Sequence, residues 1–163
     1  MTYTSDKILT QEYVKWISNE FSEHPCIAGT VNFQKKFNGE QLTEKTAKKT
    51  LKHYRNSLSR KVYGNKARAC RGGRCIKFAP AWEGGVYDLS VGLHAHLVIP
   101  VPYGWDKDDW LATCRGTWLD LPWADKVNYD FKHMVNDGWI SYTLKHRTKR
   151  NPSEALDLEL LSL

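Results

Sequence analysis

The segment from Leu93 to Ile99 most constrains the fold, because apolar residues alternate in it with two histidines. Successive side chains of a β-strand point to opposite faces. His94 and His96 therefore share one face, and the other face is apolar: Leu93, Ala95, Leu97 and Ile99. The pattern predicts a strand, closed by Pro100, that packs a core on one side and presents two imidazoles on the other.

The rest of the chain predicts the partners of this strand. Apolar residues at helical spacing predict helices over 10–21, 43–62 and 106–118, capped by Thr10, Thr43 and Asp106, and a last helix that starts near Asn136 or Asp137. Further strands are predicted over 26–33, 75–82 and 126–131. After the leading helix the order is β-α-β-β-α-β and a helix. The expected fold class is α+β, a split β-α-β (ferredoxin-like) antiparallel sheet with helices packed on one face.

Charge and composition narrow the range of partners. The 163 residues suffice for one domain, expected over 1–152, followed by an acidic tail or linker over 153–163. The net charge is +6, and the stretch 35–77 holds 14 lysines and arginines against two glutamates. Nucleic acid is the expected partner of such a stretch. No apolar run reaches membrane length and no secretory signal opens the chain, so we expect an intracellular protein without a membrane.

The four cysteines are too few and too scattered for a disulfide framework. We expect Cys26, Cys70, Cys75 and Cys114 to be free thiols. A zinc knuckle around Cys70 and Cys75 is the alternative, but the sequence offers no second close pair of cysteines.

His94 and His96 are the first candidates for chemistry. Two imidazoles on one strand face can begin a metal site, or they can be hydrogen-bonded residues of a polar sheet face. Tyr142 and Lys145 are the second pair, because residues three apart share one face of the last helix. A phenolate nucleophile beside a cation suits attack on a phosphodiester, whereas a packed tyrosine and a solvated lysine are the plain structural alternative.

These two motifs, taken together, resemble those of a known family. His94-Ala95-His96 before an apolar run, and Tyr142 with Lys145 on a helix downstream, resemble the H-U-H and Y-x-x-K motifs of the HUH superfamily of rolling-circle replication initiator (Rep) endonucleases. Ala95 is smaller than the usual middle residue. Thr30 and Asn32 echo the Thr-x-Asn motif of the family's first strand. The resemblance spans about residues 25–150.

The resemblance implies a sequence-specific, single-stranded DNA nickase with strand-joining activity. His94 and His96 would hold Mn²⁺ or Mg²⁺, Tyr142 would form a 5′-phosphotyrosine adduct, and Lys145 would assist. Its partner would be single-stranded DNA at a replication origin, which can form a hairpin, together with a helicase from the host or the element. The implied location is the host cytoplasm, or the nucleus for a eukaryotic virus.

The family's third metal ligand, a carboxylate or amide of the neighbouring strand, would be Glu83. A turn at Gly84-Gly85 would place Glu83 too far from the histidines. A turn at Asp88-Leu89 would pair it with His94, with the two glycines as a bulge. The family pattern favours the second register.

Single-stranded DNA is expected to cross the face that carries the histidines. Its candidate contacts are polar residues of the first strand and a basic loop rich in glycine: Thr30, Asn32, Arg68, Arg71, Arg74 and Lys77. The same residues would also suit a half-exposed polar strand and a solvated run of charges, neither of which needs DNA.

Three other functions remain open. A single-tyrosine HUH transposase uses the same chemistry but typically another residue in place of Lys145. A non-catalytic nucleic-acid-binding domain of the same shape predicts exposed aromatic residues on the two central strands. A simple metal-dependent hydrolase would have no use for Tyr142.

Overall fold

A computed structural model describes residues 2–70, 74–88, 91–136, 138–143, 155–157 and 160. Its helices are α1 (Thr2–Phe21), α2 (Glu44–Tyr63), the 3-10 helix η1 (Gly64–Cys70), α3 (Lys107–Leu119) and α4 (Gly138–Thr143). Its strands are β1 (Cys26–Phe33), β2 (Lys36–Phe37), β3 (Glu40–Gln41), β4 (Ala79–Glu83), β5 (His94–Pro100) and β6 (Ala124–His133). No helix within these ranges has the length and apolar character needed to span a membrane.

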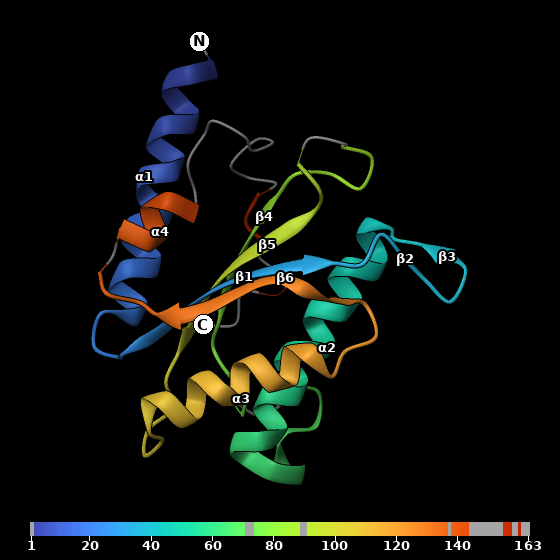
Figure 1. The fold of residues 1–163 in the computed structure, drawn as a ribbon. Coiled ribbons are helices and arrows are strands. Elements are labelled where there is room, and N and C mark those ends of the chain that lie inside the picture. Colours follow the sequence, from blue (N-terminus) through green and yellow to red (C-terminus); the bar gives the residue numbers. More distant parts are fainter. Residues whose placement is uncertain are drawn as a thin grey trace.

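Four of the strands form one antiparallel sheet in the order β4-β5-β1-β6 (Figure 1). The chain leaves β1 through α2 to reach the far edge at β4, and it leaves β5 through α3 to reach the opposite edge at β6. This is the α+β, ferredoxin-like split β-α-β arrangement that the sequence predicts.

Helices α2 and α3 cover one face of the sheet and enclose the larger core. Leu51 of α2 and Trp110 of α3 are fully buried there. The predicted apolar side of the histidine strand lies in this core: Leu93, Ala95, Leu97 and Ile99. The histidines consequently face the other side.

The second face of the sheet is partly covered, which differs from the predicted packing of helices on one face. Phe21 of α1 and Ile140 of α4 pack with Cys26, Ala79 and Val98 in a smaller cluster. These strand positions lie toward the end of β5 that is remote from His94. The remainder of this face, around the histidines, lines a cavity described below.

Several predicted element ends were correct and others were wrong. Thr43 caps α2 by accepting a hydrogen bond from the Thr46 amide, and Asp106 caps α3. The backbone N–H groups of residues 109 and 108 lower the pKa of Asp106. Helix α1 begins at Thr2, so Thr10 lies inside it and is not its cap. Strand β4 begins at Ala79 rather than at residue 75.

The C-terminal segment packs against the domain where the structure describes it. Leu156 bridges Ala81 on the outer edge of β4, and the Trp82 indole donates to Asp157 Oδ2 at 3.2 Å. Arg55 of α2 donates to the Leu160 carbonyl at 3.2 Å. These described residues of the predicted tail are therefore buried parts of the domain.

Candidate metal centre and facing tyrosine

The pairing of β4 with β5 determines whether Glu83 can join the histidines. Glu83 lies directly opposite His94, and Ala81 lies opposite His96. The structure thus has the register in which the chain turns beyond the two glycines. Gly84 has a φ of 74°, and a Cβ there would lie 2.4 Å from the Val91 carbonyl oxygen. Only glycine fits this position, so Gly84 helps to fix the register that the site needs.

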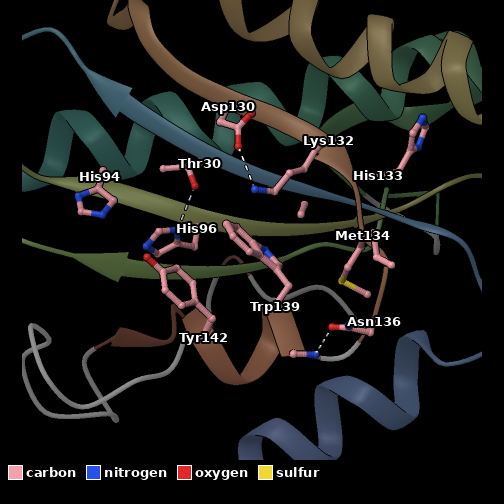
Figure 2. Close-up of a pocket in the computed structure, with 13 residues that line it drawn as sticks. Thr30, His94, His96, Asp130, Lys132, His133, Met134, Asn136, Trp139 and Tyr142 are labelled. Carbon is pink, nitrogen blue, oxygen red and sulfur yellow. Dashed lines mark hydrogen bonds and ion pairs between the residues drawn. The ribbon is translucent and has the colours of Figure 1, made fainter.

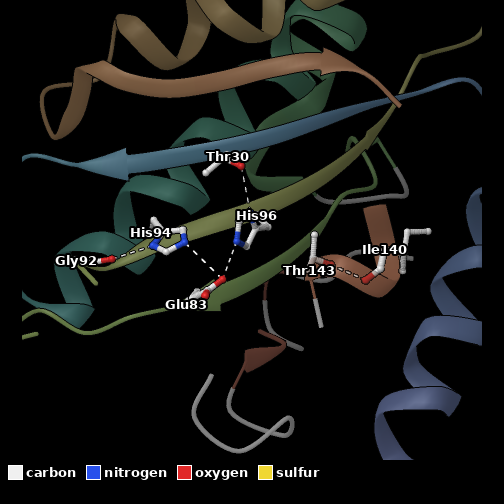
Figure 3. A network of polar contacts seen from close by, with 7 residues as sticks. All are labelled: Thr30, Glu83, Gly92, His94, His96, Ile140 and Thr143. Atoms are coloured by element: carbon white, nitrogen blue, oxygen red, sulfur yellow. Dashed lines mark hydrogen bonds and ion pairs between the residues drawn. The ribbon is translucent and has the colours of Figure 1, made fainter. Parts of the chain in front are cut away.

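Glu83, His94 and His96 form a compact cluster of potential metal ligands (Figure 3). Glu83 Oε2 lies 2.8 Å from His96 Nε2 and 3.5 Å from His94 Nε2. One ligand atom from each residue falls within 4.8 Å of the other two. The His96 side chain is only 5% exposed, and those of His94 and Glu83 are 15% and 14% exposed. Two imidazole nitrogens and a carboxylate oxygen can hold a metal ion.

Hydrogen bonds on the outer side of each ring orient the two imidazoles. His94 Nδ1 donates to the Gly92 carbonyl at 2.8 Å, since a carbonyl oxygen can only accept. The neutral ring therefore carries its lone pair on Nε2, which is the nitrogen that faces Glu83. His96 Nδ1 lies 3.1 Å from Thr30 Oγ1 of β1. Such outer partners are typical of metal-ligating histidines.

We expect Thr30→Val to weaken Mn²⁺ binding by roughly 10- to 100-fold, the usual cost of losing an outer partner. Valine has nearly the same shape and suits a strand, but it has no hydroxyl to form the hydrogen bond with His96 Nδ1. Thr30→Ser keeps the hydroxyl and should keep the affinity. Titration calorimetry of the three proteins measures this, and a valine variant that binds as tightly as the native protein would show that Thr30 does not orient His96.

Tyr142 faces the cluster from α4 (Figure 2). Its ring centroid is 5.8 Å from that of His96, and Tyr142 is 50% exposed. Trp139 stacks on Tyr142 at 5.4 Å, contacts His96 at 5.6 Å, and donates from its indole to the Leu97 carbonyl at 3.3 Å. Trp139 thereby fixes α4 on β5 and holds the phenol beside the imidazoles. Lys145 lies outside the described residues.

A cavity of about 710 Å³ joins Tyr142 to both histidines. The strands, α4 and the segment between β6 and α4 contribute its polar lining: Thr30, His94, His96, Asp130, Lys132, His133, Asn136 and Tyr142. Asp130, Lys132 and Trp139 were not among the predicted site residues. Asp130 and Lys132 alternate with the core residues of β6 and so lie on the histidine face. The predicted strand over 126–131 ended one residue before Lys132.

The predicted DNA contacts divide into those near the cavity and those away from it. Thr30 lines it, whereas Asn32 donates to the Asn128 carbonyl and lines a second cavity of about 680 Å³. Neither Arg74, which is exposed, nor Lys77, which pairs with Glu20 of α1, lines the metal-side cavity. Both precede β4 at the end remote from Glu83. Arg71 and the Arg68 side chain lie outside the described part of the structure.

Among the cysteine side chains that the structure describes, one differs from its predicted state. Cys26 and Cys114 are buried thiols outside any disulfide, as expected, but Cys75 is disulfide-bonded. Burial raises the pKa of Cys114 to about 12, which keeps this thiol neutral and unsuited to metal binding. Among the described residues, no cluster of potential metal ligands includes a cysteine. The zinc knuckle finds no support.

Comparisons with protein-family models, with curated proteins and with solved structures found no match for this chain.

Proposed function

We propose that this protein is a metal-dependent, single-stranded DNA endonuclease and strand transferase of the HUH Rep type. The observation that carries the proposal is the position of Tyr142, which contacts the His96 ring and shares one cavity with both histidines of the Glu83, His94 and His96 cluster. A nucleophile and a candidate metal centre on one sheet face are what cleavage of a phosphodiester by covalent catalysis requires. The net charge of +6 favours a polyanionic substrate.

The residues divide the chemistry between them. The phenolic oxygen of Tyr142 attacks phosphorus, the bond to the 3′ oxygen breaks, and the phenolic proton passes to water while the leaving oxygen takes one up. Glu83, His94 and His96 would hold Mn²⁺ or Mg²⁺, which when bound polarises the scissile phosphate as a Lewis acid. Thr30 and the Gly92 carbonyl orient the two imidazoles. Attack by a 3′-hydroxyl on the adduct reverses the reaction and rejoins the strand without ATP.

The rival functions make different demands on the site. A non-catalytic nucleic-acid-binding domain needs aromatic rings on the two central strands, but the residues of β1 and β5 that line the cavity are Ala28, Thr30, His94 and His96, and none of them is Phe, Tyr or Trp. A simple hydrolase gives no role to the tyrosine that α4 holds beside His96. A single-tyrosine transposase would use the same residues, and Lys145 in the Y-x-x-K spacing favours the initiator.

End-labelled DNA tests the proposal. A pool of random single strands is incubated with protein and Mn²⁺, and the products are separated under denaturing conditions. A 3′ label should remain on a protein band that resists denaturant, and a 5′ label should appear in shorter strands that end in 3′-hydroxyl. EDTA should abolish both products. Shorter strands with a free 5′-phosphate and no adduct would overturn the proposal in favour of water as nucleophile, and binding without cleavage would favour a binding domain.

A further inference from the structure

Lys132 occupies a position in the cavity that the proposed chemistry does not use. It pairs across the sheet with Ala28 of β1, and Asp130 pairs with Thr30, so both project from the face that carries the histidines. The Lys132 ammonium lies 3.2 Å from Asp130 Oδ2 and 5.0 Å from the centre of the Trp139 ring. Figure 2 shows it between β6 and α4.

Trp139 connects this ammonium to the reactive groups. The same indole contacts the His96 ring at 5.6 Å and stacks on Tyr142 at 5.4 Å. Lys132 is thus separated by a single aromatic ring from both the candidate metal ligand and the candidate nucleophile. Among the described residues that line the cavity, it is the only lysine or arginine. His133 lines the cavity too, but it pairs with Ile27, a residue of the larger core, and its imidazole contacts Asp108 of α3 at 2.7 Å, on the other side of the sheet.

The surroundings of Lys132 suit an anion that enters from solvent. The side chains of Lys132 and Asp130 are 56% and 57% exposed, and an ion pair so exposed is weak and exchanges readily. A phosphodiester can therefore replace the Asp130 carboxylate, while the indole face keeps the ammonium in place through a cation–π contact. A lysine binds phosphate as a mobile point charge, which fits a flexible strand that crosses the sheet.

We infer that Lys132 binds a backbone phosphate of the single strand beside the phosphate that Tyr142 attacks. The inference rests on the proposed function for the identity of the polymer, but it concerns binding and not cleavage. Asp130 then acts as a competing anion, which occupies the ammonium until DNA arrives. The alternative role is purely structural, in which Lys132 only fixes α4 on β6 through Trp139.

The salt dependence of DNA binding separates these roles. Binding of a fluorescein-labelled single strand is measured by fluorescence anisotropy between 50 and 300 mM KCl, so that the dependence of affinity on salt reports the number of counterions released. EDTA is present throughout to prevent cleavage. Each phosphate contact on a single strand contributes about 0.7 to the slope of log K against log salt. We expect Lys132→Gln to lower the slope by about that amount and Lys132→Arg to preserve it. Asp130→Asn should strengthen binding.

Arg115→Gln is the matched control, because Arg115 is exposed on α3, on the opposite side of the sheet and outside the basic stretch 35–77, and its loss changes the net charge equally. Its slope should equal that of the native protein. Equal slopes for the Lys132→Gln and Arg115→Gln proteins would overturn the inference and leave the proposed function standing. A lower melting temperature of Lys132→Gln with an unchanged slope would assign Lys132 the structural role. If the native protein bound no single strand even at 50 mM KCl, both proposals would fail.

Discussion

The Tyr142→Phe protein should bind single-stranded DNA as the native protein does and form no covalent adduct. The substitution removes one oxygen and keeps the ring that stacks on Trp139 and contacts His96. The fold and the cavity should therefore persist. Removal of a nucleophile lowers the rate by roughly 10⁴-fold or more, so the adduct should fall below detection in a denaturing gel.

Tyr129→Phe is the control for this experiment. Tyr129 pairs with Val31 of β1 and packs against the larger core, on the face away from the histidines. Its substitution should leave adduct formation unchanged. Lys145→Ala should slow the reaction without abolishing it, because a cation assists charge development but forms no bond. An adduct that persisted in Tyr142→Phe and vanished in Tyr129→Phe would place the nucleophile on the sheet face opposite the histidines and contradict the account.

Replacing both His94 and His96 by alanine should abolish Mn²⁺ binding. The variant retains only the Glu83 carboxylate of the cluster, and a single carboxylate does not make a specific site. In the native protein, Mn²⁺ at 100 times its Kd should stabilise the fold by about 2.7 kcal/mol, and the variant should gain nothing. Thermal unfolding with and without Mn²⁺ measures the difference, and calorimetry gives the affinities.

His53→Ala controls for the loss of an imidazole elsewhere, because His53 is an exposed residue of α2 on the other side of the sheet. It should bind Mn²⁺ as tightly as the native protein. Retention of native affinity by the double alanine variant would place any metal site away from this cluster. Glu83→Gln should weaken binding, since it exchanges a charged oxygen for an amide.

The parts of this site that follow a simple period could be predicted from the sequence. Alternation along the histidine strand correctly separated the core residues from His94 and His96, and both imidazoles do share one face. Glu83 could not be assigned in the same way, because its place depends on the register of a hairpin. The register depends on the positive φ of Gly84. From the sequence, the two adjacent glycines could form either the hairpin turn itself or a bulge before a later turn.

Other features depended on contacts distant in sequence. Lys77 belongs to a basic stretch that favoured a DNA contact, and its ion pair with Glu20, more than fifty residues earlier, has no signal in that stretch. The burial of Leu156 and Leu160 depends on their docking onto β4 and α2. The β2-β3 hairpin, in contrast, had a local signal, although it was not predicted. Asn38 and Gly39 both have positive φ, as an Asn-Gly turn requires.

The most direct test of the central claim is to locate the adduct by mass spectrometry. Trypsin cleaves after Lys132 and Lys145, and the intervening peptide contains Tyr142 as its only tyrosine, with Ser141 and Thr143 beside it. The trapped protein–DNA complex is digested with nuclease and trypsin, and the modified peptide is fragmented. We predict a nucleotide joined through its 5′-phosphate to the phenolic oxygen of Tyr142. A nucleotide on any other residue, or cleaved DNA with no modified peptide, would contradict the account.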